Sequence, residues 1–444
     1  MRIGCGAGFS ADRLDPAVDL ARDGGLDALV FECVGERTLA FGHRDRRADP
    51  DRGYNPLLGR RLRAVWPLAA ARGTRIVTNM GAANPLAAGR EAVRIATELG
   101  LGDGGSVAVV LGDDVTDRIG PETPLPAIGA TVGDLDHDLI GANAYIGADA
   151  ILPALETGAG LVIGGRLADP SMFVALLRFR HGWSADDWAR LGAGTVVGHL
   201  MECGAQVTGG YFADPGFKNV PDLAFVGYPI AEVADDGSVT ITKLPNAGGM
   251  VTGETVREQL MYEVHDPARY LTPDVSADFS GVRITDQGHD RVMVTGGTGH
   301  ARPDLLKVTV GFDGGYLAEG EVSYAGPGAA DRARLAAEVT ETRLARVHGI
   351  RDDLRLDLIG LNAVHRHATY VETPDAPTDV RLRVAGRFRD RDQAEILLWE
   401  VESLLCAGPA GGGGFRGRIT PTIVTHDAWL DRAEVPTRVE VLTP

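Results

Sequence analysis

Five apolar, strand-like segments in the first 170 residues each end in a cluster of polar and glycine residues. The carboxyl ends of parallel strands meet at one edge of an α/β sheet, and the ligand sites of such folds lie at that edge. Five endings of this kind would bring polar side chains together, which favours an enzyme. The clusters are Gly4–Phe9, Glu32–Arg37, Asn79–Pro85, Gly112–Asp117 and Gly164–Pro170.

The first half of the chain alternates between short apolar strands and amphipathic helices, as right-handed βαβ units do. This alternation predicts an α/β N-terminal domain with a mainly parallel sheet. The expected strands are at 2–6, 27–33, 74–79, 106–111 and 160–164. The expected helices are at 13–23, 57–72, 85–99, 141–157 and 170–181.

The pattern changes after about residue 185, where a helix at 186–204 precedes a hairpin that turns at Asp235–Gly237 and a helix at 254–264. The rest of the chain predicts an α+β C-terminal domain, an antiparallel sheet with two helices on one face. Its strands are expected at 304–312, 317–324, 354–362, 379–387, 417–425 and 436–442, with a turn at 313–315 and helices at 328–348 and 391–406. We therefore expect three regions, residues 1–220, 221–300 and 301–444.

Composition excludes several classes of protein. The chain has 44 basic and 61 acidic side chains, a net charge of −17, which argues against a nucleic acid or an anionic membrane as general partner. It contains no apolar run of membrane-spanning length and no signal peptide, so we expect a cytoplasmic protein. Its four cysteines lie far apart without C-x-x-C or structural-zinc spacing, so we expect no metal of that kind.

Acidic residues follow two of the expected strands. Glu32 ends the second strand, where a partly dry cleft can raise a carboxyl pKa towards neutrality and make it a general acid or base. Glu36 and Arg37 come next and could form a surface ion pair. Asp113 and Asp114 follow the fourth strand, where acids suit a divalent metal ion or a proton relay. An Asp that caps the next segment explains the same pattern.

Two later segments also carry reactive side chains. Arg166 could hold a substrate carboxylate or phosphate with two hydrogen bonds, or Asp169 could neutralise it. His199 and Glu202 share one face of an expected helix, which suits a proton relay or half of a metal site. Cys203 could act as a nucleophile with His199 as its base, or could simply pack in the core.

Other motifs are absent or incomplete. Without a G-x-x-x-x-G-K-[ST] run, or a G-x-G-x-x-G run after the first strand, the sequence argues against nucleoside triphosphates and NAD. Asp134–Asp138 begins like a calcium loop but lacks its glycine and final glutamate, so we interpret it as a solvated loop. Consecutive glycines follow an expected helix, among them Gly411, Gly412 and Gly413. Their backbone amides could form an anion-binding nest for a phosphate of coenzyme A, or the segment could be a flexible connector.

Many longer runs occur in one order along the chain. They are Gly6–Ser10, Phe31–Thr38, Thr78–Pro85, Gly112–Val115, Arg166–Pro170, Gly198–Gln206, Thr208–Phe212, His265–Pro267 and Gly408–Gly414. In this order, between residues 2 and 443, the chain resembles the acyclic terpene utilisation (AtuA-like) family. The same runs supply further polar residues that we expect to contact a substrate: Arg37, Asn79, Asn84, Gln206 and Tyr211.

The resemblance implies a role in the bacterial breakdown of citronellol and geraniol, which proceeds through coenzyme A thioesters. Longer members of the family resemble this chain with a ferredoxin-like domain added at the C-terminus, which elsewhere forms a separate small protein. This chain ends at Pro444 without such a domain, so we expect a small ferredoxin-like partner subunit in trans, together with a homo-oligomer.

Three functions are compatible with these residues. The leading hypothesis is a catabolic lyase or hydratase that uses acid–base chemistry on a carboxylate or acyl-CoA derived from a terpenoid or branched acid. Such chemistry needs no redox cofactor. The alternatives are a Cys203-dependent hydrolase or acyl transferase, and a non-catalytic acyl-CoA-binding or scaffold subunit.

Overall fold

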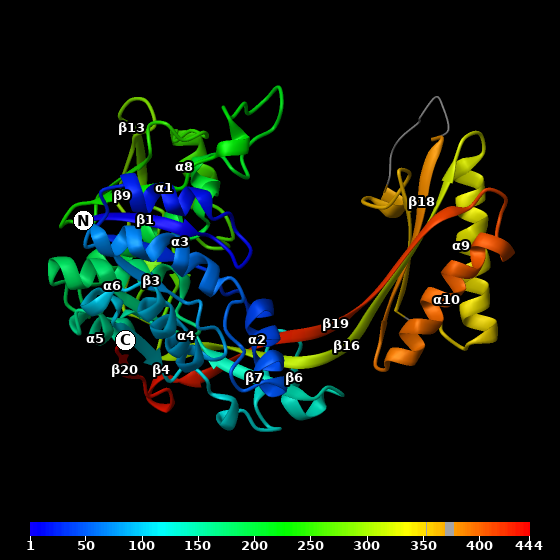
Figure 1. Ribbon diagram of the computed structural model, residues 1–444, viewed down its shortest axis with the longest axis horizontal. Helices are drawn as coiled ribbons and strands as arrows, with labels where there is room; N and C mark the ends of the chain where they lie inside the picture. Colours follow the sequence, from blue (N-terminus) through cyan, green and yellow to red (C-terminus); the bar gives the residue numbers. More distant parts are fainter. Residues whose placement is uncertain (352, 369–376) are drawn as a thin grey trace. The chain divides into compact units, whose positions relative to one another are not determined.

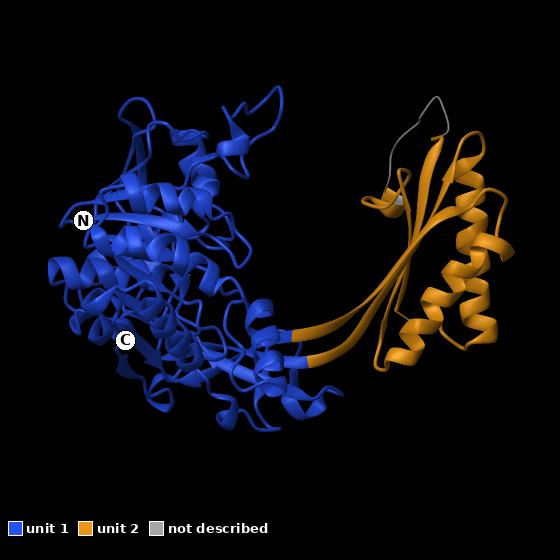
Figure 2. Ribbon diagram, viewed as in Figure 1, with its two compact units in different colours: residues 1–312, 425–444 blue, residues 313–424 orange. Residues whose placement is uncertain are grey.

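The computed structural model describes residues 1–351, 353–368 and 377–444 (Figure 1). These form two compact units, residues 1–312 together with 425–444, and residues 313–424 (Figure 2). The first unit is thus built from both ends of the chain. The division into three regions at residues 220 and 300 stays a prediction.

The first unit contains a sheet of ten strands whose centre is parallel. Five strands lie side by side there, in the order β1 (Arg2–Ala7), β2 (Ala28–Phe31), β3 (Arg75–Thr78), β8 (Leu161–Ile163) and β4 (Val107–Leu111). Each pairs in parallel with its neighbour, so all five end at the same edge. The residues of β2, β4 and β8 are all buried, which suits strands covered on both faces. The five predicted strands and the parallel sheet are confirmed.

Antiparallel strands flank this centre. On the β1 side follow β9 (Pro229–Val233), β10 (Val239–Lys243), β14 (Val292–Thr295) and β13 (Arg283–Asp286), and on the β4 side lies β20 (Arg438–Leu442). The hairpin predicted at Asp235–Gly237 is confirmed between β9 and β10. The strand predicted at 436–442 exists, but it pairs with β4 and not with the C-terminal sheet. The apolar outer edge of β4 needs a partner, and this strand supplies one.

Two rows of helices cover the parallel strands. The first row packs on Leu29, Ile76 and Val109 and consists of α1 (Asp15–Asp23), α3 (Leu58–Ala71) and α4 (Pro85–Glu98). Residues of the strands alternate between faces, so Val30, Val77 and others point to the second row. That row contains α5 (Ala148–Glu156), α6 (Asp169–His181) and α7 (Trp188–Glu202), which pack against one another.

Several smaller elements complete the first unit, and two of them correct the sequence analysis. A helix that was not predicted, α2 (Glu36–Ala48), follows β2. The helix expected at 141–157 is α5 alone, because residues before it form the strand β7 (Leu139–Ala144). The others are α8 (Gly253–Leu260), β5 (Pro124–Leu125), β6 (Ala130–Thr131), β11 (Tyr270–Leu271), β12 (Ser276–Asp278) and β15 (Thr298–His300).

The second unit is a two-layer sandwich. Its elements follow in the order β16 (Leu305–Ala325), α9 (Ala329–Val347), β17 (Leu354–Ile359), β18 (Asp379–Phe388), α10 (Arg391–Ala407) and β19 (Gly413–Asp431). The strands lie in the order β17-β18-β16-β19, and both helices cover one face (Figure 1). This is the β-α-β-β-α-β arrangement of a ferredoxin-like fold, so the chain itself contains one such unit and the expected partner would supply a second. The predicted α+β class is confirmed.

One prediction for this region is wrong. No turn forms at Asp313–Gly315, because β16 is a single strand that continues through these residues. Its N-terminal part pairs with β7 and its C-terminal part with β18. Gly315 has a left-handed φ of 68°, and a Cβ there would lie 2.2 Å from the Phe388 carbonyl oxygen. Glycine at position 315 therefore allows β16 to pass close to the Phe388 carbonyl. An Asp-Gly-Gly run is also favourable in a turn, so the sequence alone does not distinguish the two structures.

Within the described residues, no helix is long and apolar enough to cross a membrane.

Candidate active site

A cavity of about 650 Å³ opens where β1, β2 and β8 end and where α7 reaches the same edge. We call it the polar chamber. It brings together many of the residues predicted from the sequence: Glu32, Arg37, Asp169, Glu202, Cys203, Gln206 and Tyr211. Gly8 permits the close approach of β1 to α7, because a Cβ at this position would lie 2.4 Å from the Cys203 carbonyl carbon.

Glu32 is a buried carboxyl on the floor of the polar chamber. Its Oε1 accepts hydrogen bonds from the Val34 N–H (2.9 Å) and from Asn79 Nδ2 (3.0 Å). Asn79 is itself held because its Oδ1 accepts from the Cys33 N–H at 2.8 Å. Burial raises the pKa of Glu32 most, the neighbouring Asp169 carboxylate adds to the rise, and Arg166 and the two hydrogen bonds oppose it, so that the pKa is about 8. Asn79 therefore positions Glu32, and Glu32 can hold a proton at neutral pH.

The buried Arg166 forms an ion pair with Asp169, whose side chain is 31% exposed. The Nη1···Oδ1 distance is 2.7 Å, and the side chain of Arg166 also lies over the ring of Tyr145, 4.0 Å from its centroid. The sequence left two roles open for Arg166, binding a substrate anion or pairing with Asp169. This geometry is that of the pair with Asp169. Asp169 in turn lines the polar chamber, so the pair holds its carboxylate in place.

Asp113 and Asp114 occupy different environments. Asp113 is buried, and its Oδ2 accepts from the backbone N–H of Arg166 (2.7 Å) and from Asn143 Nδ2 (2.8 Å). Burial raises its pKa to about 6, although both hydrogen bonds oppose the shift. Asp114 lies nearer the surface and pairs with Arg46 at 2.8 Å. Asp113 therefore anchors the loop that carries Arg166, and neither Asp lines the polar chamber.

His199 and Glu202 form the buried pair that their spacing predicts. His199 Nδ1 lies 3.0 Å from Glu202 Oε1, and the rings of Tyr270 and Phe279 pack on the imidazole with centroids 5.2 and 5.5 Å away. Burial raises the pKa of Glu202 to about 7, against the lowering effect of His199. In the part of the chain that the structure describes, Glu202 Oε2 and His199 Nε2 are buried without a hydrogen-bond partner.

Cys203 follows this pair but is a poor nucleophile. Burial, and then the charge of Glu202, raise the pKa of its thiol well above the usual range. The ring of His199 makes its hydrogen bond with Glu202. A thiolate, which nucleophilic catalysis needs, is therefore disfavoured at Cys203.

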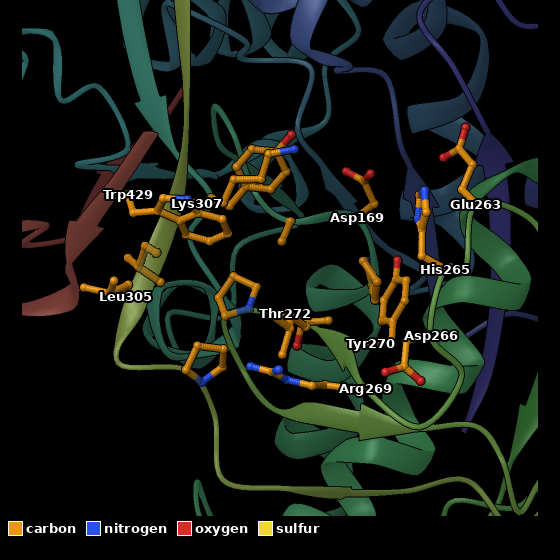
Figure 3. A pocket seen from close by; sticks show the side chains of 17 residues that line it. Asp169, Glu263, His265, Asp266, Arg269, Tyr270, Thr272, Leu305, Lys307 and Trp429 are labelled. Atoms are coloured by element: carbon orange, nitrogen blue, oxygen red, sulfur yellow. The ribbon is translucent and has the colours of Figure 1, made fainter. Parts of the chain in front are cut away.

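A second cavity of about 340 Å³ is shown in Figure 3. It shares two lining residues, Asp169 and Glu263, with the polar chamber. We call it the apolar chamber, since one wall consists of aromatic and aliphatic side chains: Tyr145, Tyr270, Leu271, Leu305, Leu306 and Trp429.

Sequence reasoning missed Glu263 and Tyr270. Both lie in the loop and short strand after α8, beside the His265–Pro267 run that was recognised only as part of a resemblance. Glu263 has a left-handed φ of 57°, which is unusual for a residue other than glycine. Its charge also helps to raise the pKa of Glu202.

Other predicted residues lie elsewhere. Asn84 caps α4 and donates to the carbonyls of Pro50 and Arg52 at 2.8 and 2.7 Å, so it has a structural role. Glu36 accepts hydrogen bonds from Tyr145 (2.8 Å) and Lys307 (3.1 Å) and does not pair with Arg37. Arg37 and Tyr211 are exposed on the rim of the polar chamber.

The glycine segment expected to bind a phosphate belongs to the second unit. Gly411 and Gly412 precede β19, which begins at Gly413. Beside them, Arg332 donates to the carbonyl of Ala410 at 2.8 Å and to that of Ala325 at 2.7 Å. That guanidinium holds the loop in place. Among residues 1–351, 353–368 and 377–444, no group of three or more His, Cys, Asp or Glu is arranged to hold a metal ion.

Comparison with known proteins adds one finding. The model of a family described as acyclic terpene utilisation family protein AtuA matches residues 1–441. No curated protein and no solved structure matches the chain.

Proposed function

The chain belongs to the acyclic terpene utilisation family AtuA, and on this premise we propose that it is a cytoplasmic lyase or hydratase of catabolism. Its substrate would be a carboxylate or acyl-CoA derived from a terpenoid or branched acid. The reaction would add or remove water next to the carbonyl by acid–base chemistry.

One observation carries the proposal: two buried carboxyls with near-neutral pKa values face the same chamber. The pKa of Glu32 is about 8 and that of Glu202 about 7, so at pH 7 Glu32 is mostly protonated while Glu202 is substantially ionised. Asp169 lies close enough to both to raise each pKa. Two acids whose environments separate their pKa values are the usual sign of an acid and a base in one site.

The two carboxyls divide the reaction between them. In a dehydration, Glu202 would take the proton next to the carbonyl while His199 holds its other oxygen. The electron pair of that C–H bond would form the new double bond as the C–O bond breaks. Glu32 would give its proton to the departing hydroxide, which leaves as water. Hydration is the reverse, so the same two groups serve both directions.

The test uses the purified chain with a panel of branched 2-enoyl-CoA and 3-hydroxyacyl-CoA esters. Turnover is measured as a change in enoyl absorbance and as deuterium uptake from heavy water. Glu32→Gln and Glu202→Gln should each lower kcat by about 10² or more. Glu232→Gln is the matched control, because Glu232 forms ion pairs with Arg2 and Arg291 far from the chamber and should leave kcat unchanged.

Two results would contradict the proposal. Full turnover in both Glu32→Gln and Glu202→Gln would show that these carboxyls are not the acid and the base of the reaction. Tight binding of an ester without conversion, even with a small ferredoxin-like partner added, would identify a non-catalytic binding subunit. A native mass spectrum tests the partner and the homo-oligomer separately, since a homo-oligomer that is active alone needs no partner.

A further inference from the structure

The apolar chamber presents an unusual amount of hydrophobic surface to solvent. Three of its large side chains are strongly exposed, Leu271 at 46%, Leu305 at 48% and Trp429 at 43%. Single exposed apolar residues are ordinary, but several around one cavity mark a binding surface. The cavity and its rim lie wholly within the first unit.

The polarity of the chamber changes from one side to the other. Figure 3 shows Trp429 and Leu305 on one side of the chamber and Asp169, Glu263 and His265 on the other. Asp169 and Glu263 also line the polar chamber. A ligand that extends through both cavities would therefore pass from a polar region, along carboxylates, into an apolar one.

Two of the described lining residues are Lys or Arg, Lys307 and Arg269, and Lys307, on the side of Trp429 and Leu305, is already engaged. Lys307 Nζ lies 3.1 Å from a Glu36 oxygen and 3.3 Å from an Asp427 oxygen, and it sits over the ring of Tyr145. Its charge is neutralised by these groups, and its aliphatic stem adds to the apolar wall. The wall formed by Tyr145, Leu305 and Trp429 is consequently suited to a hydrocarbon group, while the exposed Arg269 is the lining cation that an anion could reach.

We infer that the apolar chamber binds the hydrocarbon part of an amphiphilic carboxylate or acyl thioester whose polar end occupies the polar chamber. The volume of about 340 Å³ falls in the range of small-molecule sites. Asp169 and Glu263 line both chambers, and this adjacency favours a chain on the same ligand over a side chain of another protein. The inference depends on the proposed function in one respect, namely that the polar end of the ligand is the end that reacts.

The experiment measures the affinity of straight-chain carboxylates from butanoate to decanoate, kept below the concentrations at which they form micelles. Calorimetry and tryptophan fluorescence report binding, and Trp429→Phe should abolish the fluorescence response while calorimetric binding persists. Kd should fall by about twofold to fourfold for each methylene until the cavity is full.

Leu305→Glu should flatten this dependence on chain length, because it places a charge in the apolar wall at an exposed position that tolerates it. Leu335→Glu is the matched control: Leu335 is 49% exposed on α9 in the other unit, and the substitution should leave every Kd unchanged. Affinity independent of chain length, or an equal loss in both variants, would overturn the inference. A third result would also overturn it: the chain self-associates, Leu305→Glu abolishes this association, and affinity does not depend on ligand chain length.

The same titration separates this inference from the proposed function. Chain-length dependence that survives in Glu32→Gln and Glu202→Gln, with no turnover of any ester by the unaltered chain, would uphold the binding site and refute the lyase.

Discussion

The buried carboxyl of Glu32 should make the stability of the first unit fall as pH rises. Its pKa is about 8 in the folded chain and near the ordinary value of 4.5 when exposed. Between these values the folded chain keeps a proton that the unfolded chain has lost, so alkaline conditions favour unfolding. The free energy of unfolding should decrease by about 1.4 kcal/mol per pH unit in this window, or up to about 5 kcal/mol in all.

Glu32→Gln should remove this dependence. A glutamine can accept the same hydrogen bonds from Val34 and Asn79 but cannot ionise. The stability of the variant relative to the unaltered chain should therefore rise from pH 5 to pH 8 by about 4 kcal/mol, and stay level above pH 8. Such a change is large beside a typical domain stability of about 5–15 kcal/mol.

Urea unfolding at pH 5, 6, 7, 8 and 9 measures the effect. Four of the five tryptophans belong to the first unit, so fluorescence in a Trp399→Phe background reports that unit alone. Glu232→Gln is the control: hydrogen bonds from Arg291 lower the pKa of Glu232, so its contribution is lost only below pH 5. A difference between Glu32→Gln and the unaltered chain that is constant from pH 5 to pH 9 would refute the argument for a protonated Glu32.

Three further predictions follow from single contacts. Cys203→Ser should keep turnover within about twofold, since the thiol does not ionise, and a loss of 10² or more would restore the nucleophile hypothesis. Gly8→Ala should lower the free energy of unfolding by about 1–3 kcal/mol, because its Cβ would lie 2.4 Å from the Cys203 carbonyl carbon; an unchanged urea midpoint would show that the contact can relax. Glu263→Gly should raise stability by about 0.5–1 kcal/mol by relieving the left-handed φ of 57°, while turnover falls; a variant that gains stability and keeps full turnover would show that Glu263 has no part in the reaction.

The parallel strands could be predicted because each is a short, fully apolar run between turn residues, and that pattern depends on local sequence alone. The pairing of β20 with β4 could not, since it joins residues more than 300 positions apart. Likewise, a turn and a continuous β16 use the same Asp-Gly-Gly run. Only the contact of Gly315 with Phe388 distinguishes them.

The residues of the candidate site likewise divide into those that local sequence predicts and those whose role depends on distant contacts. Glu32 and Glu202 could be predicted because the sequence places one at a strand end and the other on a helix face. The role of Asp113 depends on Asn143, thirty positions later, and on the backbone of Arg166. Glu263 lies in a loop without periodicity, and only the shape of the two cavities places it at their junction.

The place of β20 in the large sheet has a consequence for how the chain is made. The edge of β4 at Leu111 stays unpaired until the ribosome has released Arg438–Leu442, after the whole second unit has emerged. At ordinary rates of synthesis this interval is on the order of tens of seconds. During that time an apolar strand edge is open to pairing with other nascent chains. Shortening the chain by its last strand should therefore reduce the yield of soluble protein more than the loss of a few exposed residues would suggest.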